Sequence, residues 1–213
     1  MKPAHILCMA FLAPLAACQG GGNGEAISNV TLSDGPAAGA SSFMVAGDPA
    51  GSFGEAFVGA DGQGVMLIEK DGSSAASAYY VVTKNTVRRV PAADSALQVS
   101  TVAGSAAPLG AKTIAPPDLA GHYYTLRDNA VVDFTISGSG LISAGASACG
   151  VNGAVQADSG ITGALPLTMS FNGCGAADGS YQGYAVSTSD SGAGSIRIVA
   201  ENRSRVEDML AFR

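Results

Sequence analysis

The sequence predicts an all-β protein, either an antiparallel sandwich or a small up-and-down barrel, preceded by a flexible N-terminal tether. Short segments alternate apolar and polar residues with a period of two, as in Val132, Phe134 and Ile136. Turns rich in Gly, Ser and Asp separate these segments, and the chain holds 29 glycines. No stretch repeats its apolar residues with the 3.6-residue period of a helix. In the second half of the chain we therefore expect seven or eight strands, spaced roughly ten residues apart.

The first 17 residues are typical of an export signal. Lys2 precedes an apolar run from Ile6 to Leu15. That run is about half the length of roughly 20 residues that a membrane-spanning helix needs. We predict that residues 1–17 are a signal peptide that is removed on export.

The next motif, Leu15-Ala16-Ala17-Cys18, resembles the lipobox of bacterial lipoproteins. In that family the cysteine sulfur takes a diacylglyceryl group, the chain is cleaved before the cysteine, and the new amino terminus is acylated. The resemblance implies that Cys18 is lipidated and that the membrane is a partner through this anchor. Gln19 stands where an aspartate would favour the inner membrane, so the resemblance implies the outer membrane, with either face possible. A simple secretory signal that leaves Cys18 as a free thiol is the alternative.

Residues 18–42 are expected to form the lipidated flexible tether. They are mostly Gly, Asn, Ser and Ala, which bury too little apolar surface to offset the entropy of ordering the chain. The alternative is that Val30-Thr31-Leu32 forms a first strand.

Residues 43–103 read as an N-terminal β-hairpin region, and residues 104–117 as a joint rich in Pro and Gly. The pairs Asp61-Gly62 and Asp71-Gly72 each separate apolar segments and favour hairpin turns. Pro116-Pro117 cannot donate hydrogen bonds to a sheet and therefore marks a break.

Residues 118–213 form the predicted C-terminal β domain, where the alternation is clearest. Leu165, Leu167, Met169 and Phe171 repeat the period of two. Two segments, "GSFGEAFV" from Gly51 and "GSYQGYAV" from Gly179, share their order of Gly, Ser, an aromatic residue and a final Val, so an internal repeat is possible. The alternation of Gly and aromatic residues resembles the small β-barrels of surface lipoproteins of the transferrin-binding-protein type.

Four cysteines are present, of which Cys8 leaves with the signal peptide and Cys18 is assigned to the lipid. Cys149 and Cys174 remain, and two thiols exported to an oxidising compartment are expected to pair. A disulfide that closes this loop contributes about 3.5 kcal/mol in the chain-entropy model. A redox centre would need a Cys-x-x-Cys motif, and a zinc site would need further Cys or His ligands.

The charge balance argues against nucleic acid as a partner. The chain has 11 basic and 17 acidic residues, with a formal net charge of −6. Lys2 leaves with the signal peptide, which makes the mature charge −7. Nucleic acid binding calls for clustered Lys and Arg, which this sequence lacks.

Catalytic signatures are also missing from the sequence. His122 is the single histidine after the signal peptide, and no Gly-x-Ser-x-Gly elbow accompanies it. No phosphate-binding loop, dinucleotide fingerprint or calcium loop occurs. We therefore expect no enzyme activity, no cofactor and no metal site.

These observations favour an envelope lipoprotein whose β-body is a non-enzymatic binding or structural module, with an envelope protein or a glycan as partner. The alternative is an inhibitor or immunity-type lipoprotein that blocks a periplasmic enzyme. The oligomeric state is open. Because tyrosine is favoured at interfaces, the candidate contact residues are the tyrosines that we expect to be exposed: Tyr79, Tyr80, Tyr123, Tyr124, Tyr181 and Tyr184.

Overall fold

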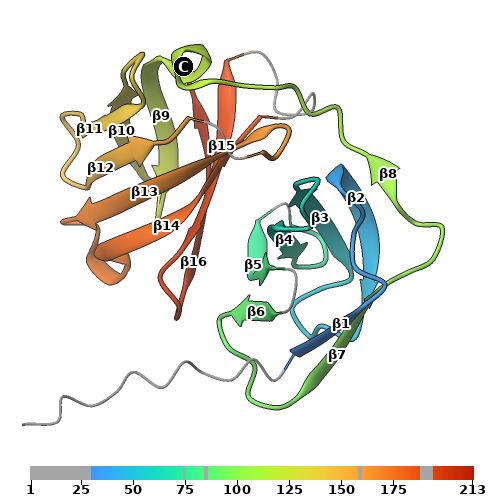
Figure 1. The fold of residues 1–213 in the computed structure, drawn as a ribbon. Coiled ribbons are helices and arrows are strands. Elements are labelled where there is room, and N and C mark those ends of the chain that lie inside the picture. The colour runs from blue at the N-terminus through green and yellow to red at the C-terminus, as the bar shows by residue number, and fades with distance from the viewer. Residues whose placement is uncertain (1–29, 74, 84–85, 158–159, 188–193) are drawn as a thin grey trace, which may run out of the picture.

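The structure, a computed structural model, describes residues 30–73, 75–83, 86–157, 160–187 and 194–213. The predicted signal peptide, Cys18 and the first part of the predicted tether lie outside these residues. The described chain forms two β-bodies, an N-terminal sheet and a C-terminal barrel, joined by a single segment (Figure 1). The all-β prediction is confirmed.

The N-terminal sheet is rolled but not closed. Its hydrogen-bonded order is β1-β7-β2-β3-β4-β5-β6, with β8 paired to β2 outside this path. The two end strands, β1 and β6, lie in contact with each other without pairing. The strands are β1 (Val30–Ser33), β2 (Gly39–Ala46), β3 (Phe53–Val58), β4 (Gly64–Glu69), β5 (Ala76–Val82), β6 (Val87–Val90), β7 (Leu97–Thr101) and β8 (Ala107–Pro108).

The C-terminal body is a closed up-and-down barrel in which each strand pairs with its neighbours in sequence and β16 returns to β9. Two short 3-10 segments accompany it, η1 (Pro116–Leu119) and η2 (Gly175–Ala177). The strands are β9 (Gly121–Arg127), β10 (Ala130–Ile136), β11 (Leu141–Ala144), β12 (Gly150–Val155), β13 (Ala164–Asn172), β14 (Gly179–Val186), β15 (Ser195–Glu201) and β16 (Val206–Phe212).

The expected seven or eight strands of the second half agree with the eight strands of the barrel, and the described residues contain sixteen strands in all. One expectation about the strands was wrong. The predicted tether 18–42 extends too far, since β1 and the first half of β2 lie within it. Val30 and Leu32 pack against the core of the N-terminal sheet, and β1 pairs in parallel with β7. The composition of residues 30–33 does not reveal that β1 pairs with β7, because that strand lies far away in the sequence.

Apolar side chains fill the barrel interior. Val132, Phe134 and Ile136 are at most 1% exposed, and the alternating residues of β13 lie in the same core. An eight-stranded barrel can hold either packed side chains or one small ligand. Here the interior is a packed core.

An arginine lies against an aromatic ring at each end of the barrel. At one end the Arg213 guanidinium is 5.4 Å from the centre of the Tyr123 ring and donates to its hydroxyl. At the other end Arg127 lies 5.2 Å from the Phe171 ring and pairs with Glu207 at 2.6 Å. Such contacts cover the core where the strands end, so binding is to be sought on the outer face of the barrel.

The disulfide between Cys149 and Cys174 is confirmed, with a sequence separation of 25 residues. It joins the segment just before β12 to the one just after β13. Both cysteines pack against the barrel core. The bond therefore belongs to the C-terminal body alone.

Candidate functional site

The structure corrects the predicted exposure of the tyrosines. Tyr79, Tyr80, Tyr123 and Tyr181 are at most 4% exposed. Tyr184 is half-buried and packs against the cluster between the two bodies. Tyr124 is 47% exposed and is the one member of the set available as a large contact surface. The others face inward or between the bodies because apolar rings with one polar tip pack well beside a hydrogen-bond partner.

Three of the buried hydroxyls show this directly. Tyr123 donates to the Leu119 carbonyl at 2.9 Å, and Tyr181 donates to the Ala177 carbonyl at 3.0 Å. Tyr80 donates to the carboxylate of Asp48. Each ring therefore contributes to stability rather than to a contact surface.

The N-terminal core contains a buried ion pair. The Asp48 carboxylate accepts two hydrogen bonds from Arg89, each 2.9 Å long, and the two side chains are 0% and 8% exposed. Burial pulls the pKa of Asp48 upward, but hydrogen bonds from Arg89, Tyr80 and the Ala50 amide outweigh it, so the pKa lies below its usual value. Because all its partners are structural, this pair fastens β6 to the loop after β2.

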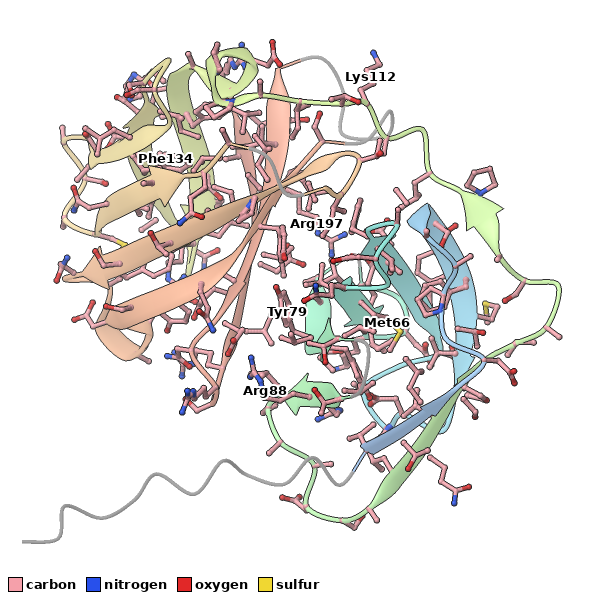
Figure 2. The ribbon with its side chains drawn as sticks, in the orientation of Figure 1. Met66, Tyr79, Arg88, Lys112, Phe134 and Arg197 are labelled. Atoms are coloured by element: carbon pink, nitrogen blue, oxygen red, sulfur yellow. A yellow bond between two sulfur atoms is a disulfide. The ribbon has the colours of Figure 1, made fainter. Side chains whose placement is uncertain are left out.

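The contact between the two bodies combines an apolar cluster with a charged one. Phe57, Val65, Leu67 and Tyr79 from the N-terminal sheet pack with Ala164, Val186 and Val199 from the barrel. Arg197 of β15 lies beside them and reaches three carboxylates (Figure 2). Its nitrogens are 2.6 Å from Glu55, 3.0 Å from Glu69 and 2.7 Å from Asp208.

The charged cluster is mostly buried, with side chains 8–18% exposed. Burial lowers the pKa of Arg197, but the carboxylates more than compensate and raise it above its usual value. Burial also raises the pKa of Glu69, although the positive charge of Arg197 opposes this. The cluster holds the two bodies together, and its charges are already paired with one another.

His122 has contacts that explain it structurally. Its Nε2 lies 3.2 Å from an Asp133 oxygen, and its Nδ1 lies 3.4 Å from the Tyr124 hydroxyl. In the described part of the chain, neither ring nitrogen contacts a serine, threonine or cysteine that could act as a nucleophile.

Asp133, the partner of His122, holds a loop in place. Asp133 accepts hydrogen bonds from the amides of Ala146 and Ser147, which lowers its pKa to about 2. Gly145 is required beside it, because a Cβ there would lie 2.0 Å from the Asp133 carboxylate. The pair thus fixes the loop between β11 and β12.

A patch of apolar side chains lies exposed on the outer face of the barrel. It consists of residues from three adjacent strands, β16, β9 and β10, and we call it the apolar patch: Tyr124, Leu126, Val131, Leu210 and Phe212. Phe212 is paired with Tyr124, and Val131 with Leu126. The Thr125 hydroxyl donates to the Leu210 carbonyl, which places Leu210 against β9. The five side chains are 46–70% exposed.

Sequence reasoning missed this patch, although a signal was present. The run Met209-Leu210-Ala211-Phe212 is apolar at consecutive positions, so one strand presents apolar residues on both faces. Met209 and Ala211 face the barrel core, and the other two face solvent. In β4 the same kind of run marks burial on both faces, against the N-terminal core and against the barrel.

A second surface feature is a hollow of about 530 Å³ on the outer face of β12, β13, β14 and β15. We call it the polar groove. Its outward side chains come from two rows of paired residues across these strands. They are Asn152, Ser170 and Ser180 in one row and Thr168, Gln182 and Glu201 in the other, with Asn202 and Arg203 of the following turn at the edge.

The described residues contain no cluster of three or more His, Cys, Asp or Glu side chains arranged to hold a metal ion. Over the same residues, no helix is long and apolar enough to cross a membrane. No family model, curated protein sequence or solved structure matches this chain.

Proposed function

We propose that this protein is a non-enzymatic binding module of the bacterial envelope, anchored by lipid on Cys18 to the outer membrane, and that it binds a protein partner through the apolar patch. The anchor rests on the sequence of residues 1–19, which lie outside the described residues. The resemblance of the hairpins to surface lipoproteins of the transferrin-binding-protein type motivates the same proposal.

The apolar patch is the observation that carries the binding part. Exposed apolar side chains scattered singly are ordinary, but a contiguous group on adjacent strands marks an interaction surface. This group includes two aromatic rings, Tyr124 and Phe212, and aromatic residues are enriched at the centres of protein interfaces. The face lies on a closed barrel, which presents it rigidly.

Charge around the patch indicates which partner fits. The charged side chains at its border are the acidic Asp128, 90% exposed, and Asp133, which pairs across strands with Tyr124, and the basic Arg213, whose guanidinium is held by the Tyr123 hydroxyl and the Asp118 carbonyl. A second copy of this chain would bring these acidic residues together, and anionic lipid head groups would be repelled as well. The fitting partner is a protein with an apolar surface that is rimmed by Lys and Arg.

The anchor is tested by fractionating cells that express the Cys18→Ser variant. We expect the wild-type protein in the membrane fraction and the variant in the soluble fraction, because the lipid provides the attachment. A variant that still sediments with membranes would contradict the anchor.

The docking surface is tested with a photo-crosslinking amino acid at Leu126 and, as a control, at Gln98, an exposed position of the N-terminal sheet. We expect one defined adduct with a basic envelope protein from position 126, none from position 98, and loss of the adduct when Leu210→Glu is added. An adduct with the mass of two copies, or with lipid alone, would contradict the proposed partner. An adduct with a periplasmic enzyme, accompanied by loss of its activity, would favour the inhibitor alternative.

A further inference from the structure

The polar groove differs in chemistry from the apolar patch and lies elsewhere on the barrel. Its side chains are amides and hydroxyls on outward positions of neighbouring strands. In the part of the chain that the structure describes, the hydroxyls of Thr168, Ser170 and Ser180 have no protein partner. These hydroxyl groups are therefore free to bond to a ligand with many hydroxyls of its own.

The amides at the groove are oriented by single hydrogen bonds that leave their other halves available. Asn152 Oδ1 accepts from the Ala144 amide at 3.2 Å, which leaves Nδ2 as a donor. Gln182 Nε2 donates to Glu201 at 3.2 Å, which leaves Oε1 as an acceptor. Because these amides are already held in place, they lose less conformational entropy when a ligand binds.

The charges that line the groove balance, unlike those of the whole protein. Glu201, 1% exposed, is its one carboxylate and is neutralised by Arg88 at 2.7 Å. The backbone amide of Arg203 also donates to Glu201. Arg203 adopts a left-handed backbone conformation with φ of 73°. Its exposed guanidinium has no ion pair among the described residues. Because Arg88 already neutralises Glu201, the positive charge of Arg203 is left available at the groove, within a chain of formal net charge −6.

The frame around the groove is rigid. The Cys149–Cys174 disulfide joins the start of β12 to the end of β13, close to Asn152 and Ser170. Arg88 belongs to β6 of the N-terminal sheet, so the contact between the two bodies borders the same groove (Figure 2). A binding site needs this kind of support to keep its polar groups in position.

We propose that the polar groove binds an acidic oligosaccharide, with the hydroxyls and amides bonding to sugar hydroxyls and Arg203 to the sugar carboxylate. A guanidinium recognises a carboxylate through two parallel hydrogen bonds. The volume of about 530 Å³ falls within the range of small-ligand sites. This site is independent of the protein partner proposed for the apolar patch.

The test is an NMR titration of the full folded chain with 3′-sialyllactose, compared with lactose, which lacks the acidic sugar. We expect saturable shifts for the amides around Ser170, Ser180 and Arg203 with sialyllactose, and at least about tenfold weaker binding of lactose. Arg203→Gln should weaken sialyllactose binding about tenfold or more and leave the fold intact, because the side chain is exposed. Lys112→Gln removes an exposed charge on the segment that joins the two bodies, outside the residues that line the groove, and should change nothing.

Additional variants separate sugar recognition from simple attraction of an anion. Ser170→Ala with Ser180→Ala should weaken sialyllactose binding while all charges remain. Equal binding of lactose and sialyllactose, equal loss in Lys112→Gln, shifts that map outside the groove, or full competition by acetate at the sugar's concentration would each overturn the proposal. Leu210→Glu should leave sugar binding unchanged, so failure of the apolar patch is distinguished from failure of this site.

Discussion

The two β-bodies are stabilised in different ways. The C-terminal barrel closes on itself, so every strand has two neighbours and no edge is left for unwanted pairing. The N-terminal sheet stays open between β1 and β6 and fastens β6 through the buried pair of Arg89 and Asp48. Closure and a disulfide stabilise one body, whereas a buried ion pair and docking against the barrel stabilise the other.

This difference implies that a substitution that removes one of these stabilising features should destabilise the body that contains it. The strongest test is Arg197→Met, which leaves Glu55, Glu69 and Asp208 buried without their cation. We expect the free energy of unfolding to fall by roughly 3–5 kcal/mol. Calorimetry should show the N-terminal sheet melting before the barrel. Lys112→Met is the matched control on an exposed residue, and a single unshifted transition in the Arg197 variant would refute the role given to docking.

Asp48→Ala should act only on the N-terminal sheet. It leaves Arg89 buried without a counter-charge, which is expected to lower the free energy of unfolding by roughly 3–5 kcal/mol. Amide hydrogen exchange should accelerate in β2 to β6 and change little in β9 to β16. Asp94→Ala, at an exposed carboxylate, serves as control. Equal acceleration in both bodies would mean that they unfold as one unit.

Replacement of Cys149 and Cys174 together by serine should act only on the barrel. Opening a loop with a sequence separation of 25 residues is expected to lower its free energy of unfolding by about 3.5 kcal/mol. Exchange should accelerate in β9 to β16, and reduction of the wild-type protein should reproduce the effect. Faster exchange confined to the N-terminal sheet would contradict the assignment of the bond to the barrel.

The smallest effect is expected from Asp133→Asn, measured as stability against pH. The pKa of Asp133 is lowered to about 2 in the folded protein and lies near 3.9 in an unfolded chain. Its contribution is therefore complete above the unfolded value and is lost as pH falls from about 4 towards 2. The variant should show a shallower loss of stability over this range, and an unchanged slope would refute the role of the carboxylate in the β11–β12 loop.

The barrel could be predicted from the sequence better than the open sheet. Alternation in β10 and β13 identified core positions correctly because each of these strands has one apolar face inside the barrel. The pairing of β1 with β7 could not be found in this way, since nothing local specifies a parallel partner. Burial of Tyr79 was missed for a related reason: its outward face is covered by the other body, and no single-strand pattern reveals that contact.

The candidate binding surfaces were less predictable than the fold. The apolar patch depends on Phe212 meeting Tyr124 where the last strand closes onto the first strand of the barrel. The polar groove depends on registers across four strands, which bring Thr168, Gln182 and Glu201 into one row. Sequence gives the residue types along each strand, whereas neighbours across strands follow only from the completed structure.

The parallel pairing of β1 with β7 also has a consequence for biosynthesis. Val30 pairs with Leu97, so β1 emerges from the ribosome well before its partner is made. At about 5–20 residues per second this interval is roughly 3–13 s. Until β7 is present, Val30 and Leu32 have no strand to pair with, whereas the β9-to-β16 meander pairs strands that are neighbours in sequence. The N-terminal sheet is therefore the part of the nascent chain with the greatest need of protection before folding.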